Sequence, residues 1–96
     1  MNEFFDKLAD RLRAAASRRG ATIAAPILEP VVADEVLELA RVVAHTKERR
    51  FAPLASFVAG MAAERLRTSK AESDAASVAA YIREVRDELE REAPPA

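Results

Sequence analysis

The sequence predicts an all-α protein, folded as a single compact domain of four helices. Apolar residues recur three and four positions apart in four stretches, which is the spacing of one helical face. No stretch of useful length alternates apolar and polar residues as a strand would, and glycine or proline residues separate the first three stretches. We therefore expect helices over about residues 3–19, 33–47, 53–67 and 71–92, with residues 93–96 as a short disordered tail.

The length of the chain sets the number of cores. A chain of 96 residues is enough for one domain, because two cores would each be too small to be stable without disulfides or metals. Half of the residues are apolar, but only 5% are aromatic. The predicted core is thin, so self-association or docking on a partner is a reasonable source of further stability.

The first predicted helix has clear signals at both ends. Asn2 is expected to cap its start, with Glu3 and Asp6 near the positive end of the helix dipole. Gly20 follows two arginines and is expected to end the helix, because glycine tolerates the left-handed conformation found at many helix ends. The apolar face consists of Phe4, Phe5, Leu8, Leu12 and Ala15.

Residues 21–32 connect the first two predicted helices and are unusually apolar for a linker. Pro26 and Pro30 block a continuous helix across this segment. The segment can pack over the protein's own core as an ordered loop, or it can remain exposed as a surface that a partner covers. In the second case the apolar interface comprises Ile23, Ile27, Leu28 and Val31.

The second predicted helix is apolar around most of its circumference, which is typical of a central helix with neighbours on several sides. Its acidic residues come early and its basic residues come late, as the helix dipole favours. The apolar residues are Val36, Leu37, Leu39, Ala40, Val42, Val43 and Ala44.

In the third predicted helix, Pro53 fits the first turn, where its missing amide hydrogen costs no hydrogen bond. Gly60 lies in the middle, where glycine costs roughly 1 kcal/mol relative to alanine. We expect another backbone to pack closely against a strip of small residues, Ser56, Gly60 and Ala63; the alternative is a mild defect with no role. The expected buried face consists of Leu54, Phe57, Val58, Met61 and Leu66.

The fourth predicted helix begins near Ser69 to Ser73 and carries an apolar seam with charged flanks. This seam can close the domain's own core or form an intermolecular coiled coil, and its short length favours the first. The acidic residues of the helix stand beside arginines, so we expect intrahelical ion pairs rather than a Ca²⁺ or Mg²⁺ site. The seam comprises Ala75, Val78, Ile82, Val85 and Leu89.

Several classes of function lack their characteristic residues. One histidine and no cysteine leave neither a disulfide framework nor a usual zinc site. Two glycines are too few for a phosphate-binding loop or a dinucleotide fingerprint. The serines have no second histidine and no glycine-rich elbow beside them. The sequence therefore predicts a non-enzymatic protein with no cofactor and no metal.

The net charge and the N-terminal segment restrict the classes of partner and the cellular location that we expect. A net charge of -1 argues against nucleic acid as a partner. Residues 1–70 hold 12 Lys and Arg against 9 Asp and Glu, whereas residues 71–96 hold 3 against 7. The N-terminal segment is partly acidic without a long apolar run, so we expect neither a signal peptide nor a membrane span. A cytoplasmic location fits the absence of cysteine.

Polar groups converge in one place, between the second and third predicted helices. If the second helix persists through Arg49, then Arg41, His45 and Arg49 share one stripe, four residues apart. Arg50 and the unpaired amides at the start of the third helix would lie beside them. This site could bind an anion or a partner's carboxylate. Alternatively, the basic side chains only stabilise the end of the second helix.

The same region carries a resemblance to a known family. Residues 36–64 resemble an uncharacterised actinobacterial family of small helical proteins, found alone or attached to molybdenum-cofactor guanylyltransferases. The residues that carry the resemblance are Leu37, Leu39, Ala40, Arg41, Ala44, His45, Arg49, Ala52, Pro53, Leu54, Phe57, Gly60 and Ala62.

This resemblance implies an accessory or binding protein associated with molybdenum-cofactor maturation or with a molybdenum enzyme such as formate dehydrogenase. A structural interaction module is the alternative, either a homo-oligomer or a small subunit of a larger complex. A DNA-binding regulator is a third possibility, but no expected helix has a concentrated basic reading face.

Overall fold

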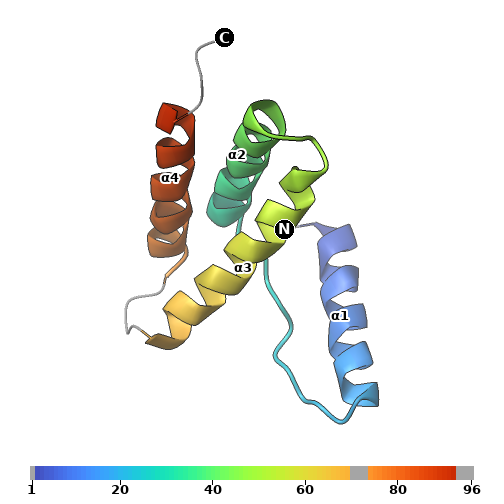
Figure 1. Cartoon of the computed structure of the whole chain (residues 1–96). Helices are drawn as coiled ribbons and strands as arrows, with labels where there is room; N and C mark the ends of the chain where they lie inside the picture. The colour runs from blue at the N-terminus through green and yellow to red at the C-terminus, as the bar shows by residue number, and fades with distance from the viewer. Residues whose placement is uncertain (1, 70–73, 93–96) are drawn as a thin grey trace. The chain divides into compact units, whose positions relative to one another are not determined.

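The computed structural model describes residues 2–69 and 74–92, which contain four α-helices and no strand. The helices are α1 (Glu3–Arg18), α2 (Pro30–Thr46), α3 (Phe51–Ser69) and α4 (Ala75–Glu92) (Figure 1). The all-α class with four helices is therefore confirmed. The chain divides into two compact units, Met1–Pro30 and Val31–Ala96, and each is described by itself. Organisation as one domain stays a prediction, and the predicted tail at 93–96 lies outside the described residues.

The start of α1 is capped as predicted. Asn2 has an extended backbone, and its side-chain oxygen accepts a hydrogen bond from the amide of Phe5 at 3.2 Å. Glu3 lies in the first turn and pairs with Lys7 at 3.0 Å on the exposed surface. The cap satisfies one of the amides that a helix start leaves without a partner.

The end of α1 depends on glycine. Gly20 has a φ of 81°, a left-handed conformation that side chains with a Cβ rarely adopt. Its amide donates to the carbonyl of Ser17 at 3.0 Å, and the amide of Ala21 donates to that of Ala16 at 2.9 Å. This pair of bonds is a Schellman motif. It ends α1 before Gly20, as the sequence predicts.

α2 begins at Pro30, three residues before the predicted start at Ala33. The prediction treated Pro30 only as a barrier to helix, but proline fits the first helical position because its φ is already helical and no donor is lost there. At the other end, the hydroxyl of Thr46 donates to the carbonyl of Val42 at 2.8 Å. The helix ends at Thr46.

α3 extends two residues beyond the predicted range of 53–67 at each end. Pro53 lies in its first turn, as predicted. α4 is described from Ala75, and positions 71–73 of its predicted range lie outside the described residues. Asp74 caps α4 by accepting a hydrogen bond from the amide of Ser77 at 2.8 Å. That backbone hydrogen bond lowers the pKa of the Asp74 carboxyl, and one from the Ser77 hydroxyl lowers it further.

The second unit folds around one cluster of buried side chains. Figure 1 shows α2 and α4 side by side, with α3 crossing obliquely between the end of α2 and the start of α4. The predicted central role of α2 agrees with the burial of Leu39, Val42 and Val43, although Leu37 is 68% exposed. The buried cluster consists of Leu39, Val43, Ala63, Val78 and Ile82.

The predicted seam of α4 closes this core. Val78 and Ile82 belong to the buried cluster, and Leu89 packs against it. Ala75 is half-buried and Val85 is 40% exposed. The intramolecular interpretation of the seam is therefore confirmed for the residues in the middle of α4.

The predicted buried face of α3 is wrong. Leu54, Phe57, Val58 and Met61 are exposed, and of the predicted set only Leu66 is half-buried. Ala63 lies in the buried cluster instead, with Ala55 and Ala59 packed against it. Spacing alone identified an apolar stripe but not which of two stripes faces inward. α3 presents its small side chains to the core of this unit and its large ones outward.

Gly60 does not provide close helix packing. A Cβ placed on Gly60 would meet nothing within 4 Å, and the residue is exposed. Ser56 is half-buried, but its hydroxyl donates to the carbonyl of Ala52 in its own helix at 2.9 Å. Of the three residues of the predicted strip only Ala63 is buried in the core of this unit, and Gly60 is the mild defect that the sequence left open.

Candidate functional site

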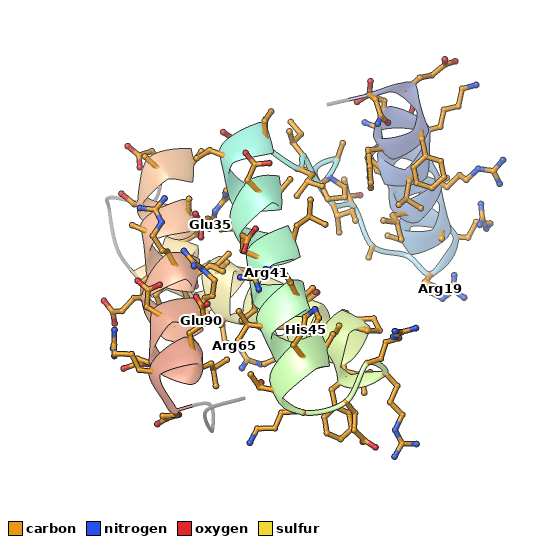
Figure 2. All side chains as sticks on the ribbon, turned by 90° about the horizontal axis from the view of Figure 1, so that it is seen from above. Arg19, Glu35, Arg41, His45, Arg65 and Glu90 are labelled. Atoms are coloured by element: carbon orange, nitrogen blue, oxygen red, sulfur yellow. The ribbon has the colours of Figure 1, made fainter. Side chains whose placement is uncertain are left out.

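The basic segment at the end of α2 differs from its predicted arrangement. Because α2 ends at Thr46, Arg49 lies in the turn before α3 and does not continue the helical stripe of Arg41 and His45. Arg41 and His45 both project from α2 (Figure 2). The predicted stripe of three basic side chains required α2 to continue through Arg49, and α2 ends before that residue.

The start of α3 also offers fewer donors than expected. The amide of Phe51 donates to the carbonyl of Glu48 at 3.0 Å, and that of Ala52 donates to the carbonyl of Arg49 at 3.2 Å. Pro53 has no amide hydrogen. Because α3 begins at Phe51 and not at Pro53, the first two amides of the helix are already bonded, which weakens the helix start as an anion site.

Two of the four predicted basic side chains are engaged by carboxylates. Arg41 lies 2.9 Å from Glu38 and 3.6 Å from Glu90. Arg50 lies 3.2 Å from Glu48, and its guanidinium stands 5.8 Å from the centre of the Phe51 ring. His45 and Arg49 are exposed. Binding of an anion or a partner by Arg41, His45, Arg49 and Arg50 stays a prediction.

A network of charges joins α2 to α4. Figure 2 shows Glu35 and Arg41 on α2 and Glu90 on α4, on the facing sides of the two helices. Glu35 lies 3.0 Å from Arg83 and 3.5 Å from Arg86. Arg86 also lies 3.0 Å from Glu90. The sequence predicted ion pairs within α4, and the pairs that cross to Glu35 were not foreseen because they link residues far apart in the chain.

Glu35 and Arg86 are the most enclosed members of this network, with side chains 12% and 18% exposed. Partial burial by itself lowers the pKa of Arg86, but the carboxylates of Asp87, Glu90 and Glu35 outweigh it and raise that pKa. One buried oxygen of Glu35 and the Nε of Arg86 make no hydrogen bond. The network is suited to holding two helices together, with its cations already neutralised by carboxylates.

The first unit contains an apolar groove between α1 and residues 25–28. Its volume is about 400 Å³. Asp6 and Asp10 are the two acidic residues at its wall. The remaining lining residues are apolar, and they are Phe5, Leu8, Ala9, Leu12, Ala25, Pro26, Ile27 and Leu28.

Only two of the four residues of the predicted apolar interface line this groove. Ile27 and Leu28 line it, and Ile27 is 76% exposed. Ile23 lines a second hollow of about 390 Å³ beside Arg13 and Ser17. Val31 is exposed in the first turn of α2, in the second unit. Partner binding by Ile23, Ile27, Leu28 and Val31 stays a prediction.

Two further findings concern the described residues only. They contain no group of three or more histidine, cysteine, aspartate or glutamate side chains arranged to hold a metal ion. Within the same residues, no helix combines the length and apolar character needed to cross a membrane.

Comparison with known proteins identifies a family. The family described as a domain of unknown function, DUF6457, matches residues 1–96, so the chain belongs to it. No curated protein and no solved structure matches the chain.

Proposed function

We propose that this member of the DUF6457 family is a non-enzymatic accessory protein that binds a partner protein through the groove of its first unit. One observation carries the proposal: the walls of the groove are formed by large, partly exposed apolar side chains, among them Phe5, Leu12 and Ile27. Exposed apolar patches of this kind mark protein-binding surfaces, because water solvates them poorly.

The occupant follows from the chemistry of the wall. An amphipathic helix can insert apolar side chains between α1 and the segment 25–28. Asp6 and Asp10 would attract a lysine or arginine at the edge of that helix. The proposed ligand is therefore a partner segment with an apolar face and a basic flank.

The identity of the partner rests on the resemblance of residues 36–64. We propose a molybdenum-cofactor guanylyltransferase, or a molybdenum enzyme such as formate dehydrogenase, met in the cytoplasm. This proposal is supported by the association of an actinobacterial family with such proteins. It is not supported by any residue of the groove. The binding role of the groove and the identity of the partner are therefore tested separately.

The groove is tested by isothermal titration calorimetry, in which the chain is titrated with each of the two purified enzymes. Leu12→Asp places a charge on the groove wall and is expected to abolish binding. Leu37→Asp is the matched control, because Leu37 is an exposed leucine on a helix of the other unit, and it is expected to bind like the wild type. Equal binding by Leu12→Asp and the wild type would refute the groove.

Failure of both enzymes to bind the wild-type chain would refute the molybdenum association. The general role is then tested in the native cell with a photoreactive amino acid at Ile27, which lines the groove. A crosslinked protein must be purified and must bind the wild type but not Leu12→Asp. Crosslinking that is unchanged by Leu12→Asp would count against a partner-binding groove.

A structural interaction module is the second candidate function, and one observation favours it. The outward stripe of α3, formed by Leu54, Phe57, Val58 and Met61, is exposed and belongs to the second unit, whereas the groove residues belong to the first. Self-association through such a stripe would serve a small domain with a thin core.

A further inference from the structure

The wall of the groove in the first unit carries two carboxylates with different surroundings. Asp6 and Asp10 lie one helical turn apart on α1, so they project from the same side of that helix. Within the described part of the chain, the other residues that line the groove are uncharged. The charge that a ligand meets in the groove therefore comes from these two side chains.

Asp10 also belongs to a neighbouring hollow. It lines both the groove and the second hollow, and Arg13 lines the second hollow as well. The guanidinium of Arg13 lies 3.8 Å from the Asp10 carboxylate. A cation at this distance offsets part of the negative charge, so Asp10 attracts a further cation less strongly.

Asp6 lacks a comparable basic neighbour in the described residues. The ion pairs of α1 there join Lys7 to Glu3 at 3.0 Å and Arg13 to Asp10, and neither includes Asp6. Of the two hollows, Asp6 lines only the groove. Its carboxylate is therefore the stronger attraction for a cation that enters the groove.

The position of Asp6 around α1 places it at the edge of the apolar wall. With about 3.6 residues per turn, the order around the helix is Leu8, Leu12, Phe5, Ala9 and then Asp6. The apolar side chains form the centre of the α1 wall, and Asp6 stands at its rim. A ligand helix that covers these apolar residues therefore brings the boundary of its own apolar face next to Asp6.

We propose that Asp6 determines the charge of the helix that the groove accepts. A lysine or arginine beside the apolar face of the partner helix pairs with Asp6, and a glutamate at that place is disfavoured by repulsion. This inference rests on the proposed function, in which the groove binds a partner helix. Burial of apolar side chains supplies most of the affinity, and Asp6 supplies the discrimination between partners of opposite charge.

The expected discrimination is modest, because Asp6 is exposed. An ion pair in contact with water changes a dissociation constant by about two- to fivefold. Dissolved salt screens such a pair, so the discrimination should shrink as the ionic strength rises.

Matched helical peptides test the choice of charge. Three fluorescent amphipathic peptides of equal length share one leucine face, and the residues beside that face are lysine, glutamine or glutamate. In anisotropy titrations at low salt, the wild-type chain is expected to bind the lysine peptide about two- to fivefold more tightly than the glutamine peptide. The glutamate peptide is expected to bind most weakly.

Two substitutions at Asp6 and one at Asp10 separate a local pair from the overall charge of the chain. Asp6→Asn is expected to remove the preference for lysine, and Asp6→Lys is expected to reverse it in favour of glutamate. Asp10→Asn is the matched control, because it removes the same charge one turn away and is expected to keep most of the preference. Circular dichroism checks that each variant is folded.

The outcomes distinguish this inference from the proposed function. Binding that is abolished by Leu12→Asp but shows no preference for lysine would overturn the role of Asp6 alone. So would a preference that Asp6→Asn retains, or one that Asp6→Asn and Asp10→Asn reduce equally. Absence of binding by all three peptides, or binding that Leu12→Asp leaves unchanged, would refute the groove as a helix-binding site and the role of Asp6 with it.

Discussion

The carboxylate of Glu35 on α2 accepts a hydrogen bond of 3.0 Å from the Nε of Arg83 on α4. The two residues are 48 positions apart, and Arg86 approaches the second oxygen of the same carboxylate at 3.5 Å. Glu35 is therefore the point where two arginines of α4 meet α2.

Removal of the Glu35 carboxylate should destabilise the second unit. We expect Glu35→Ala to lower the free energy of unfolding by about 1–2 kcal/mol, because the interhelical hydrogen bond is lost and its donors are left partly enclosed. Urea unfolding followed by circular dichroism measures this change. Glu48→Ala is the control: Glu48 pairs with the exposed Arg50, so its loss should cost about 0–1 kcal/mol. Equal effects of the two substitutions would show that the α2 to α4 bridge contributes no more than a surface pair.

Acid should weaken the start of α4. The pKa of Asp74 is lowered because its carboxylate accepts hydrogen bonds from Ser77. The bond from the backbone amide has the larger effect, and the bond from the hydroxyl has the smaller one. This cap is fully present above the ordinary pKa of an aspartate, and it is lost as the pH falls through the lowered pKa of the folded chain. The chemical shift of the Ser77 amide, followed by NMR, should report this titration.

Asp74→Asn separates charge from hydrogen bonding at the same cap. The asparagine oxygen can still accept from the Ser77 amide, so α4 should keep its start while the acid transition of the Ser77 amide disappears. An unchanged transition in Asp74→Asn would assign it to a different carboxyl group.

Gly60→Ala should stabilise the protein. A Cβ at this position meets nothing within 4 Å, and alanine loses less conformational entropy than glycine when a helix forms. The expected gain is about 0.5–1 kcal/mol in the free energy of unfolding, measured by urea unfolding of the full chain. A loss of stability would contradict this prediction and would favour close helix packing at Gly60.

Gly20→Ala should have the opposite sign. There is open space around this glycine as well, but its φ of 81° is unfavourable for alanine. We expect a loss of about 1–2 kcal/mol from the end of α1, seen as faster hydrogen exchange of the amides of residue 20 and Ala21, which donate to the carbonyls of Ser17 and Ala16. Unchanged exchange would mean that another residue can end the helix.

Much of the secondary structure was predictable because its signals are local. Asn2, Gly20 and Pro53 each act on the turn in which they stand, and all three have their predicted roles at helix ends. Pro30 misled the prediction of α2 because the same residue blocks the interior of a helix and favours its first position. Asp74 carries an N-cap signal that could have been found from the sequence.

The candidate surfaces were less predictable. The basic stripe depended on α2 continuing through Arg49, but the helix ends at Thr46, where no proline or glycine in the next four residues announces the stop. The groove in the first unit was anticipated only through Ile27 and Leu28. The sequence predicted the apolar face of α1 but did not pair it with residues 25–28.

The amino-acid sequence by itself determined that this protein is all-α, with four helices, and where most of them begin and end, because helix propensity, capping and periodicity act within a few residues. Only the tertiary structure decided that α3 turns alanines to the core and Leu54, Phe57, Val58 and Met61 outward, and that Glu35 meets Arg83. Periodicity defines the faces of a helix, but which face is buried depends on neighbours supplied by distant parts of the chain.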